Sequence, residues 1–491
     1  MNTLPLPLPL SSTSSLPATD YPMQKMPYQL HSLPVEITQL LGIVLESTDL
    51  LAVRLVCRDL NRRTMQEFSI RFFTTLQTNL SAKSLQRLDN ISKSECLAYR
   101  VESLHITDEE HIYGQDYQWH RHPSGRLTES LPGAKLLQDI LSNRLVNCRS
   151  FRIDRYNEIY VPKRTDFLVP GDIVGIVIAI VAKASIAMRS FVIQTDRSSR
   201  RPGESRLDTN RLRMPLSAQG GFNVASAHLR ELLRNYSITE DQYDWALGLI
   251  SNAPRLRNLS LMLHRKQHLH TNSFMQRLIS VQAFAALELF QLDSAHINVK
   301  TICEFLRRTR ATLRVLSFRL VTVADGSTWA TVLKTLAANL PHLENFTLMF
   351  CWEIQFERPC LVLFNGLTKI PVMPGSEKKS SNNQDLEADQ RFSEALGRPI
   401  DLQYLSWKGK RSVVAVRYLG PAMASFLRIL AEAAELRPPM QRHCGRAKAV
   451  HLFLKMCDEP CLRFGDSNGG LGSTLHDYDL VGSRRTNNAQ R

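Results

Sequence analysis

The sequence lacks the apolar segments that mark a membrane or secreted protein. Its longest apolar run covers residues 173–182, about half of the roughly 20 residues that a membrane-spanning helix needs. Near the N-terminus, residues 4–9 alternate Leu with Pro and no basic residue precedes them, so they cannot form the helical core of a signal peptide. We therefore expect no membrane insertion and a protein that is cytoplasmic, nuclear or both.

The sequence also lacks paired cysteines. Its nine cysteines are scattered, odd in number and mostly without close spacing, which is typical of a reducing compartment where thiols pack as small core residues. Two groups contain metal-ligating residue types, but neither has the tight ligand pairs that zinc prefers, apart from Cys457 and Cys461. The groups are His111, His120 and His122, and then His443, Cys444, His451, Cys457 and Cys461. We predict no metal and no cofactor.

Motifs for catalysis are absent. Residues 468–473 are Gly-rich, but they lack the Lys-Ser/Thr pair of a phosphate-binding loop and its strand-to-helix setting. Neither a nucleophile elbow nor a kinase signature occurs. We therefore predict that the chain is not an enzyme and has no catalytic residues.

Positive charge is in excess, with a formal net charge of +15. Arginines are densest in residues 197–213 and 437–448. Because aromatic residues are not interleaved with them, stacking of single-stranded nucleic acid is not indicated. We read the excess as a solvated basic surface and expect no specific nucleic-acid partner.

The first organised stretch is residues 30–73, for which the pattern predicts three short helices. Pro34 suits a first helical turn, and Glu36 is favourable there. Apolar residues then recur with helical spacing at Ile37, Leu40, Leu41, Val44 and Leu45. Asp49 is a candidate cap for the second helix, and the third covers residues 64–73. About forty residues fold marginally alone, so this segment is either a docking module with exposed apolar surface or a helical cap on the next domain.

Two runs within this stretch resemble an F-box. They are Leu33-Pro34-Val35-Glu36-Ile37 and, after a spacer, residues 49–58, which end in Leu55-Val56-Cys57-Arg58. The match has no gaps, and the continuation through Phe72 and Phe73 resembles the segment that follows the F-box in filamentous-fungal proteins. Gly42 departs from the family, which has a bulky aliphatic residue there, and is expected to loosen the first helix by about 1 kcal/mol.

The resemblance implies that this stretch binds a small Skp-type adaptor and, through it, a cullin. The apolar members would fill the adaptor's groove and Pro34 would set the approach of the first helix. Leu55 and Val56 could instead pack inside the box, and Cys57 is predicted to be a packing residue on a helix. The implied adaptor-binding residues are Leu33, Pro34, Glu36, Ile37, Leu40, Leu50, Leu55, Val56, Cys57 and Arg58.

A second regularity follows the box. A hexad of the form apolar-x-x-apolar-x-apolar recurs eight times, and helical patterns precede most copies, so strand and helix alternate. The first residues of the hexads are Val101, Cys148, Met188, Leu256, Leu287, Leu313, Leu343 and Leu402.

The spacing of the hexads resembles that of leucine-rich repeats. Those beginning at residues 256, 287, 313 and 343 are 31, 26 and 30 residues apart, whereas the other gaps are 47, 40, 68 and 59 residues. We therefore predict an irregular leucine-rich-repeat-like α/β solenoid with inserted loops, although the Asn/Cys ladder position of that family is not kept. An ordinary α/β domain is the alternative.

The predicted organisation has five parts. A disordered leader (1–29) precedes the three-helix F-box (30–73). The solenoid (74–410) carries loop insertions at 109–126, 196–221 and 371–390, and insertions in repeat arrays commonly map to one face, often the binding face. The first insertion is rich in His and aromatic residues and is expected to be an exposed loop. A helical cap (411–464), with helices at 419–436 and 447–456, and a disordered tail (465–491) complete the chain.

Together these features predict the substrate-recognition adaptor of an SCF-type cullin–RING ubiquitin ligase. The F-box would bind the Skp-type adaptor and the repeats would hold a protein substrate, whose identity the sequence does not specify. Two alternatives are an F-box protein in a non-degradative adaptor complex and a repeat-based interaction scaffold unrelated to ubiquitin. A third is an enzyme on an α/β scaffold.

Overall fold

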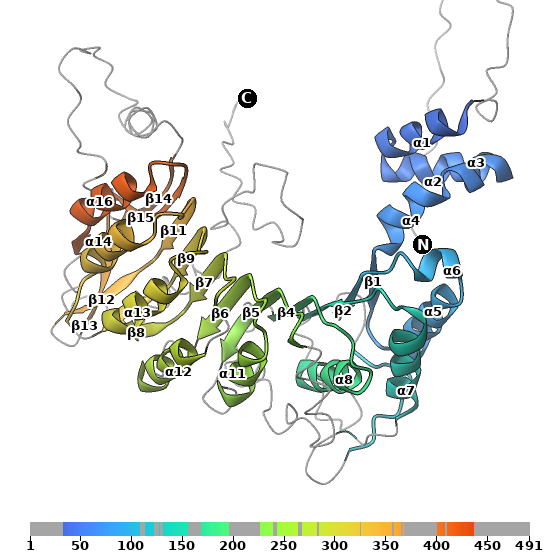
Figure 1. Cartoon of the computed structure of the whole chain (residues 1–491), viewed down its shortest axis with the longest axis horizontal. Coiled ribbons are helices and arrows are strands. Elements are labelled where there is room, and N and C mark those ends of the chain that lie inside the picture. The colour runs from blue at the N-terminus through green and yellow to red at the C-terminus, as the bar shows by residue number, and fades with distance from the viewer. Residues whose placement is uncertain are drawn as a thin grey trace, which may run out of the picture. The chain divides into compact units, whose positions relative to one another are not determined.

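The computed structural model describes residues 33–108, 113–121, 127, 131–155, 168–195, 226–238, 243–263, 268–281, 284–324, 326–355, 358–364, 367, 400–407 and 410–436 (Figure 1). The chain divides into two compact units, residues 1–72 and 73–491. Each unit is described by itself. The leader, the tail, the insertions at 196–221 and 371–390 and the helix expected at 447–456 lie outside the described residues.

The described residues of the first unit contain four helices where three were predicted. They are α1 (Val35–Val44), α2 (Ser47–Val56), α3 (Arg58–Arg63) and α4 (Met65–Phe73), whose last residue belongs to the second unit. Cys57 separates α2 from α3 because its backbone is extended, with φ −156° and ψ 162°, and its Sγ accepts a hydrogen bond from the Leu60 amide at 3.5 Å. The prediction that Cys57 lies on a helix was therefore wrong.

The start of α2 also differs from the prediction. The helix begins at Ser47, so Asp49 lies inside its first turn and does not cap it. A carboxylate in that turn still interacts favourably with the helix dipole.

The second unit is built on an eleven-stranded mixed sheet in the order β1-β2-β3-β4-β5-β6-β7-β9-β11-β15-β14. The first nine strands are parallel and follow chain order, whereas β15 and β14 are antiparallel. The parallel strands are β1 (Thr75–Thr78), β2 (Ser103–Thr107), β3 (Ser150–Arg155), β4 (Ser190–Thr195), β5 (Glu231–Ile238), β6 (Asn258–Leu263), β7 (Leu289–Asp293), β9 (Val315–Arg319) and β11 (Asn345–Met349). The chain is thus a mixed α/β protein with a large mixed sheet.

Helices connect the parallel strands, as expected for parallel pairs, which need a crossover. Figure 1 shows α7, α8, α11 and α12 on the same side of the sheet. The connecting helices are α5 (Ala82–Ser92), α6 (Glu95–Ala98), α7 (Pro132–Asp139) with a π-helical turn (Ile140–Arg144), α8 (Pro170–Lys183), α11 (Tyr243–Ser251), α12 (His268–Ser280), α13 (Val299–Thr309) and α14 (Trp329–Asn339).

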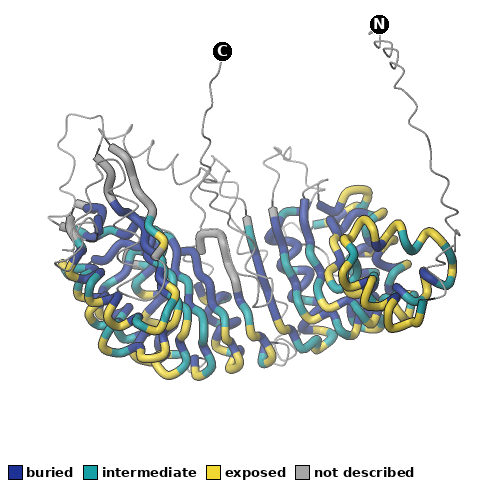
Figure 2. The backbone as a smooth tube through the Cα atoms, turned by 90° about the horizontal axis from the view of Figure 1, so that it is seen from above, coloured by how far each residue is buried: buried dark blue, intermediate teal, exposed yellow. Residues whose placement is uncertain are grey.

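Seven of the eight predicted hexads supply buried residues of the parallel strands. All three apolar positions of each copy, from Val101 through Leu348, are at most 3% exposed. Figure 2 shows these strands as buried stretches between more exposed turns. Since alternate strand residues point to the same face, this pattern packs one face of the sheet against the helices.

The eighth hexad does not continue the series. It lies in β14 (Ile400–Trp407), which pairs antiparallel with β15 (Lys410–Leu419), and alternation alone cannot distinguish a parallel from an antiparallel strand. Residues 410–419 therefore form a strand where the helical cap was expected to begin. Within the described part of that region, α16 (Met423–Ala433) is helical, followed by β16 (Glu435–Leu436).

Two parallel strands were missed because a polar residue replaces the last apolar residue of the hexad. In β1 the series reads Phe73, Leu76 and Thr78, and around β5 it reads Leu229, Leu232 and Arg234. Leu232 pairs in register with Phe191 and Leu259, and Leu76 with Leu104. Counting the copy at Leu229 divides the 68-residue gap between the hexads at 188 and 256, which makes the repeat more regular than the sequence indicated.

A small second sheet follows the ends of the later parallel strands. Its order is β16-β13-β12-β10-β8, with β8 (His296–Asn298), β10 (Thr322–Ala324), β12 (Trp352–Gln355) and β13 (Arg358–Leu363). Ser294, Leu320 and Phe350 precede β8, β10 and β12 and all adopt positive φ, at 55°, 54° and 51°. Each lies seven residues after the first residue of its hexad, as does Leu80 after Phe73 with φ 60°. In these four repeats, the parallel strand is therefore followed by the same turn with a residue of positive φ.

The aromatic insertion at 109–126 is partly core. Tyr113 and Trp119 are each 3% exposed, which contradicts the expectation of an exposed loop for this part of the insertion. Trp119 Nε1 donates to the carbonyl oxygen of Gly114 at 2.7 Å, and Gly114 has φ +69°, where a Cβ would lie 2.3 Å from that nitrogen. His111 and His122 lie outside the described residues, and His120 is exposed.

The long apolar run lies in α8, which is buried around most of its circumference. Its Asp172 is 3% exposed and pairs with Arg121 at 2.6 Å. Among the described helices, none combines the length and the apolar character needed to cross a membrane.

Glu353 on β12 gives a pH-dependent prediction for stability. It is 2% exposed; its Oε1 accepts from the Trp329 amide at 2.6 Å, and its Oε2 has no partner among the described residues. Burial raises the pKa of Glu353, and the hydrogen bond from Trp329 only partly opposes this. Since the folded state holds this proton at a pH where the unfolded chain has released it, stability falls as pH rises above about 4.5, by at most about 1.4 kcal/mol per pH unit.

We predict that Glu353→Gln, which keeps the acceptor but cannot ionise, melts at a higher temperature than the wild type at pH 8. The difference shrinks toward pH 4.5. Thermal unfolding across this pH range measures it, with the exposed Glu344→Gln as control. A difference that stays constant with pH would show that Glu353 does not titrate between the folded and unfolded states.

Candidate functional site

The interior of the first unit is made largely of small and hydroxyl side chains. Thr38, Thr64 and Ser69 are at most 3% exposed, and each hydroxyl donates to a backbone carbonyl within its own helical region, at 3.2, 2.7 and 2.7 Å. Leu50 and Leu60 are the only large apolar side chains among the described residues of this unit that are less than 9% exposed. This interior leaves the larger apolar side chains outside.

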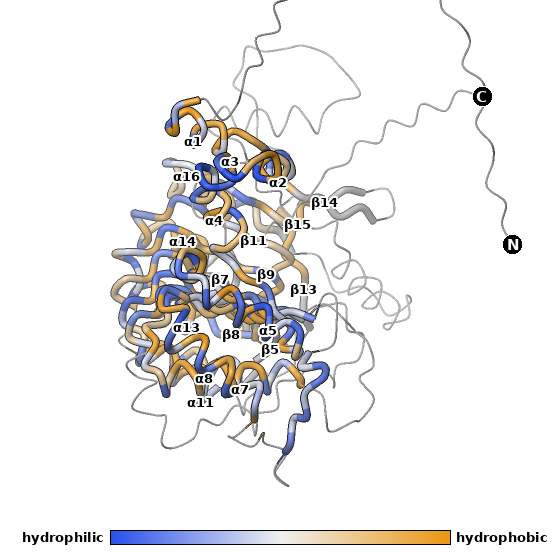
Figure 3. Tube along the Cα trace, turned by 90° about the vertical axis from the view of Figure 1, so that its right-hand side faces the viewer, coloured by the Kyte–Doolittle hydropathy of each residue, from blue (hydrophilic) through white to orange (hydrophobic). Residues whose placement is uncertain are grey.

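The surface of the same unit is strongly apolar. Thirteen large apolar side chains of the described residues are exposed, and ten of them lie between positions 35 and 70. Figure 3 shows hydrophobic stretches along α1 and α2. The ten are Val35, Ile37, Leu40, Leu41, Ile43, Val44, Leu51, Leu55, Val56 and Ile70. Such a concentration of exposed apolar side chains on so few residues is typical of an interaction surface.

The predicted stripe of α1 therefore exists but faces outward. Ile37, Leu40 and Val44 are 43%, 57% and 82% exposed, whereas Thr38 and Gly42, on the other side of the helix, are buried. The periodicity of the sequence locates the apolar face but not what covers it.

Nine of the ten candidate adaptor-binding residues lie in three places, and the tenth, Leu50, lies inside α2. Leu33 and Pro34 precede α1, Glu36, Ile37 and Leu40 are exposed on it, and Leu55, Val56, Cys57 and Arg58 surround the junction of α2 and α3. Leu55 is 87% and Val56 66% exposed, so neither packs inside the unit. Leu50 is fully buried, and its role in this structure is to fill the interior.

Two arginines hold the ends of α1. Arg63 of α3 donates to the Leu33 carbonyl before the helix. Arg71 of α4 donates to the carbonyls of Gly42 at 2.7 Å, of Ile43 and of Leu45, and it pairs with Glu67 at 2.7 Å. A cation on the last carbonyls of a helix satisfies orphan acceptors and interacts favourably with the dipole.

A third arginine connects α2 to α4. The Arg54 guanidinium lies 3.5 Å from the centre of the Phe68 ring and 3.5 Å from the Met65 sulfur. Its burial lowers the pKa of Arg54. Arg54, Arg63 and Arg71 were not identified from the sequence because their partners are distant backbone and ring atoms. Only two ion pairs between residues four apart, Asp59–Arg63 and Glu67–Arg71, carried a local signal.

Gly42 fits the packing of α1 against α4. A Cβ built there would lie 3.4 Å from Glu67 Cβ and 3.9 Å from a Leu50 methyl. These distances are ordinary van der Waals contacts, so Gly42 lies where α1 approaches Glu67 closely, and Glu67 pairs with Arg71.

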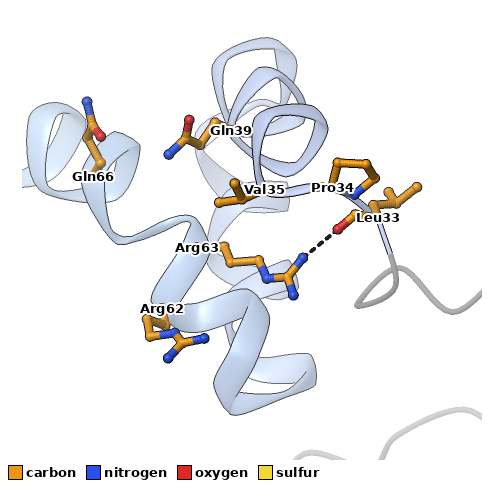
Figure 4. Close-up of a pocket in the computed structure, with 7 residues that line it drawn as sticks. All are labelled: Leu33, Pro34, Val35, Gln39, Arg62, Arg63 and Gln66. Atoms are coloured by element: carbon orange, nitrogen blue, oxygen red, sulfur yellow. Dashed lines mark hydrogen bonds between the residues drawn. The ribbon is translucent and has the colours of Figure 1, made fainter.

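A cavity of about 580 Å³ opens beside the start of α1. It is lined by Leu33, Pro34, Val35, Gln39, Arg62, Arg63 and Gln66 (Figure 4). The figure also shows the Arg63 guanidinium on the Leu33 carbonyl. Two of the sequence candidates, Leu33 and Pro34, thus border a polar recess next to the apolar face.

The metal-ligating residue types noted in the sequence give no further site. Within the described ranges, no three His, Cys, Asp or Glu side chains are grouped so that they could hold a metal ion. The set from His443 to Cys461 and the Gly-rich residues 468–473 lie outside those ranges.

We predict that Arg71→Met loosens α1 without unfolding the second unit. The substitution keeps most of the apolar stem but removes the charged hydrogen bonds, at a cost of about 2–3 kcal/mol to local stability. Hydrogen exchange of the full chain should show amides of residues 36–45 exchanging at least about tenfold faster. The control is Arg62→Met, since Arg62 is 82% exposed and, among the described residues, forms an ion pair with Asp59 alone. Equal exchange in the two variants would contradict the role of Arg71.

The sequence was compared with protein-family models and with curated proteins. No protein-family model matches the chain, and no curated protein matches it.

Proposed function

We propose that the chain is the substrate-binding subunit of an SCF-type cullin–RING ubiquitin ligase and that α1 and α2 bind a Skp-type adaptor. The observation that carries the proposal is the arrangement of the first unit, which has hydroxyls and Gly42 inside and ten large apolar side chains outside. A partner with an apolar groove would remove those side chains from water. The F-box resemblance of residues 33–58 names the class of partner.

The proposed contacts follow from exposure. Ile37 and Leu40 present the apolar face of α1, and Leu55 and Val56 present the end of α2. Pro34 and Leu33 would meet the adaptor beside the cavity at the start of α1, with Glu36 and Arg58 as exposed polar neighbours. Leu50 supports this surface from inside, and Cys57 fixes the turn between α2 and α3.

The second unit is proposed to be a leucine-rich-repeat-like array that holds a protein substrate. Supporting this are the nine parallel strands in chain order, the shared register of their buried residues and the repeated positive φ after four of them. A long sheet edge of this kind offers many side chains to a partner.

In this proposal no covalent step falls to the chain. It would raise the effective concentration of a bound substrate near a conjugating enzyme that other subunits supply. The place of action would be the cytoplasm, the nucleus or both.

We predict that Leu40→Asp and Leu55→Asp each weaken adaptor binding. A fully buried Leu contributes about 1.5–3 kcal/mol, so each variant should lose roughly tenfold to a hundredfold in affinity. Titration calorimetry of the full chain with the purified Skp-type adaptor measures this. The matched control is Val146→Asp, which changes a residue of the second unit that is 57% exposed, as Leu40 is.

Unchanged affinity in both variants, or an equal loss for Val146→Asp, would refute the assignment of the surface. If the purified protein binds no Skp-type adaptor at all, the proposed function fails. Recovery of the adaptor without a cullin from cells would instead indicate a non-degradative complex.

A further inference from the structure

One register position of the second unit forms a continuous ladder along the sheet. This position directly follows the first apolar residue of the hexad. Its amide donates a hydrogen bond to the carbonyl oxygen at the same position of the preceding strand, at 2.6–3.0 Å. Neighbours in this ladder are therefore neighbours in space. In order they are Thr74, Glu102, Arg149, Arg189, Arg230, Arg257, Glu288, Arg314 and Glu344.

Four consecutive members of the ladder are arginine. Arg149, Arg189, Arg230 and Arg257 directly precede β3, β4, β5 and β6, and all four are exposed. We call them the arginine row. Strands are spaced by roughly 4.8 Å, so the row is about 14 Å long. Four like charges at this spacing repel one another in the absence of an anion.

The arginine row is little neutralised by the protein. Arg257 lies 3.4 Å from Glu288, but no carboxylate of the described residues pairs with Arg149, Arg189 or Arg230. Arg255 and His228, both exposed, lie beside the row, with Arg255 Nη1 3.5 Å from His228 Nδ1. The next arginine of the ladder differs, since Arg314 lies between Glu288 and Glu344 and pairs with Glu344 at 2.5 Å.

The row also has defined ends. Glu102 precedes Arg149 and Glu288 follows Arg257 in the ladder. A ligand whose negative charge continued far beyond the row would meet these carboxylates, which disfavours a polynucleotide backbone, with its regular succession of phosphates. A ligand with a short negative segment would meet arginines only.

We propose that the arginine row binds a short acidic peptide segment of a protein partner, through Asp or Glu carboxylates aligned along the starts of β3 to β6. An extended peptide rises about 3.3 Å per residue, so four to five residues cover the row. Alternate residues of such a peptide, about two or three of them, would face the row, and a guanidinium can hold a carboxylate through two parallel hydrogen bonds. This proposal does not depend on the F-box, and it assigns a role to part of the net charge of +15.

The test measures binding of a fluorescein-labelled peptide of about eight residues, rich in Glu, to the purified full chain by fluorescence polarisation. Binding should weaken as salt rises from about 50 mM to about 300 mM, because the contacts are exposed charge pairs. The double variant Arg189→Gln with Arg230→Gln should lose at least about fivefold in affinity at low salt.

Two further variants make the result specific to the row. Arg314→Gln, at the same register position of β9 but between two glutamates, should bind the peptide as the wild type does. Glu288→Gln, which frees Arg257 and removes one end of the row, should bind it about twofold to threefold more tightly. Residues 197–213 and 437–448 are unchanged in every variant, so any binding by those basic stretches cancels in the comparison.

Three results would overturn the proposal. The first is equal loss of affinity in the double variant and in Arg314→Gln. The second is equal binding of a peptide with Gln in place of Glu. The third is tighter binding of a single-stranded or duplex oligonucleotide that depends on Arg189 and Arg230, which would assign the row to nucleic acid.

Discussion

The first unit depends on a constraint of size, because about forty residues enclose too little volume to bury ten large apolar side chains. Its interior is filled by Leu50, Leu60, Gly42 and hydroxyl side chains that bond to their own helices. Three arginines supply contacts between helices that a larger apolar core would otherwise provide. Arg63 and Arg71 bind the two ends of α1, and Arg54 connects α2 to α4. In the proposed function, the apolar side chains left outside would provide the free energy for binding a partner, so the same small size that limits stability would favour docking.

The second unit follows a different constraint, the register of a parallel ladder. Each strand pairs with the next at equivalent positions, so any residue type that recurs at one position forms a row across the sheet. At the apolar positions of the strands, such a row of residues lies in the core. At the position just before each strand, the row is the ladder of mostly charged residues that contains the arginine row. Core and surface thus arise from one repeat. A polar residue can replace a core residue in one copy, as Thr78 does while keeping its pairing with Ile106, whereas the register of β5 against β6 shifts after Arg234.

Much of this fold was predictable because alternation is a property of the chain itself. The hexads from Val101 to Leu348 supply the buried residues of strands, and helices precede most of these strands as predicted. Two features were missed because the spacing of apolar residues does not reveal them. One is the extended backbone of Cys57 that separates α2 from α3, and the other is the burial of Trp119, which contacts Gly114 and lies close to Gly133. For the candidate site, the sequence identified the apolar residues but could not distinguish Leu50, which is buried, from its neighbour Leu51, which is 43% exposed. That distinction is set by the packing of four helices.

Hydrogen exchange of the full chain with and without the purified Skp-type adaptor tests the central claim most directly. Amides of α1 and α2 are predicted to gain protection on addition of the adaptor, while those of the parallel strands stay unchanged, because the proposed contacts lie within residues 33–58. Protection that appears only in the second unit, or no change in α1 and α2 at saturating adaptor, would contradict the claim that the outward apolar face of the small unit is the docking surface.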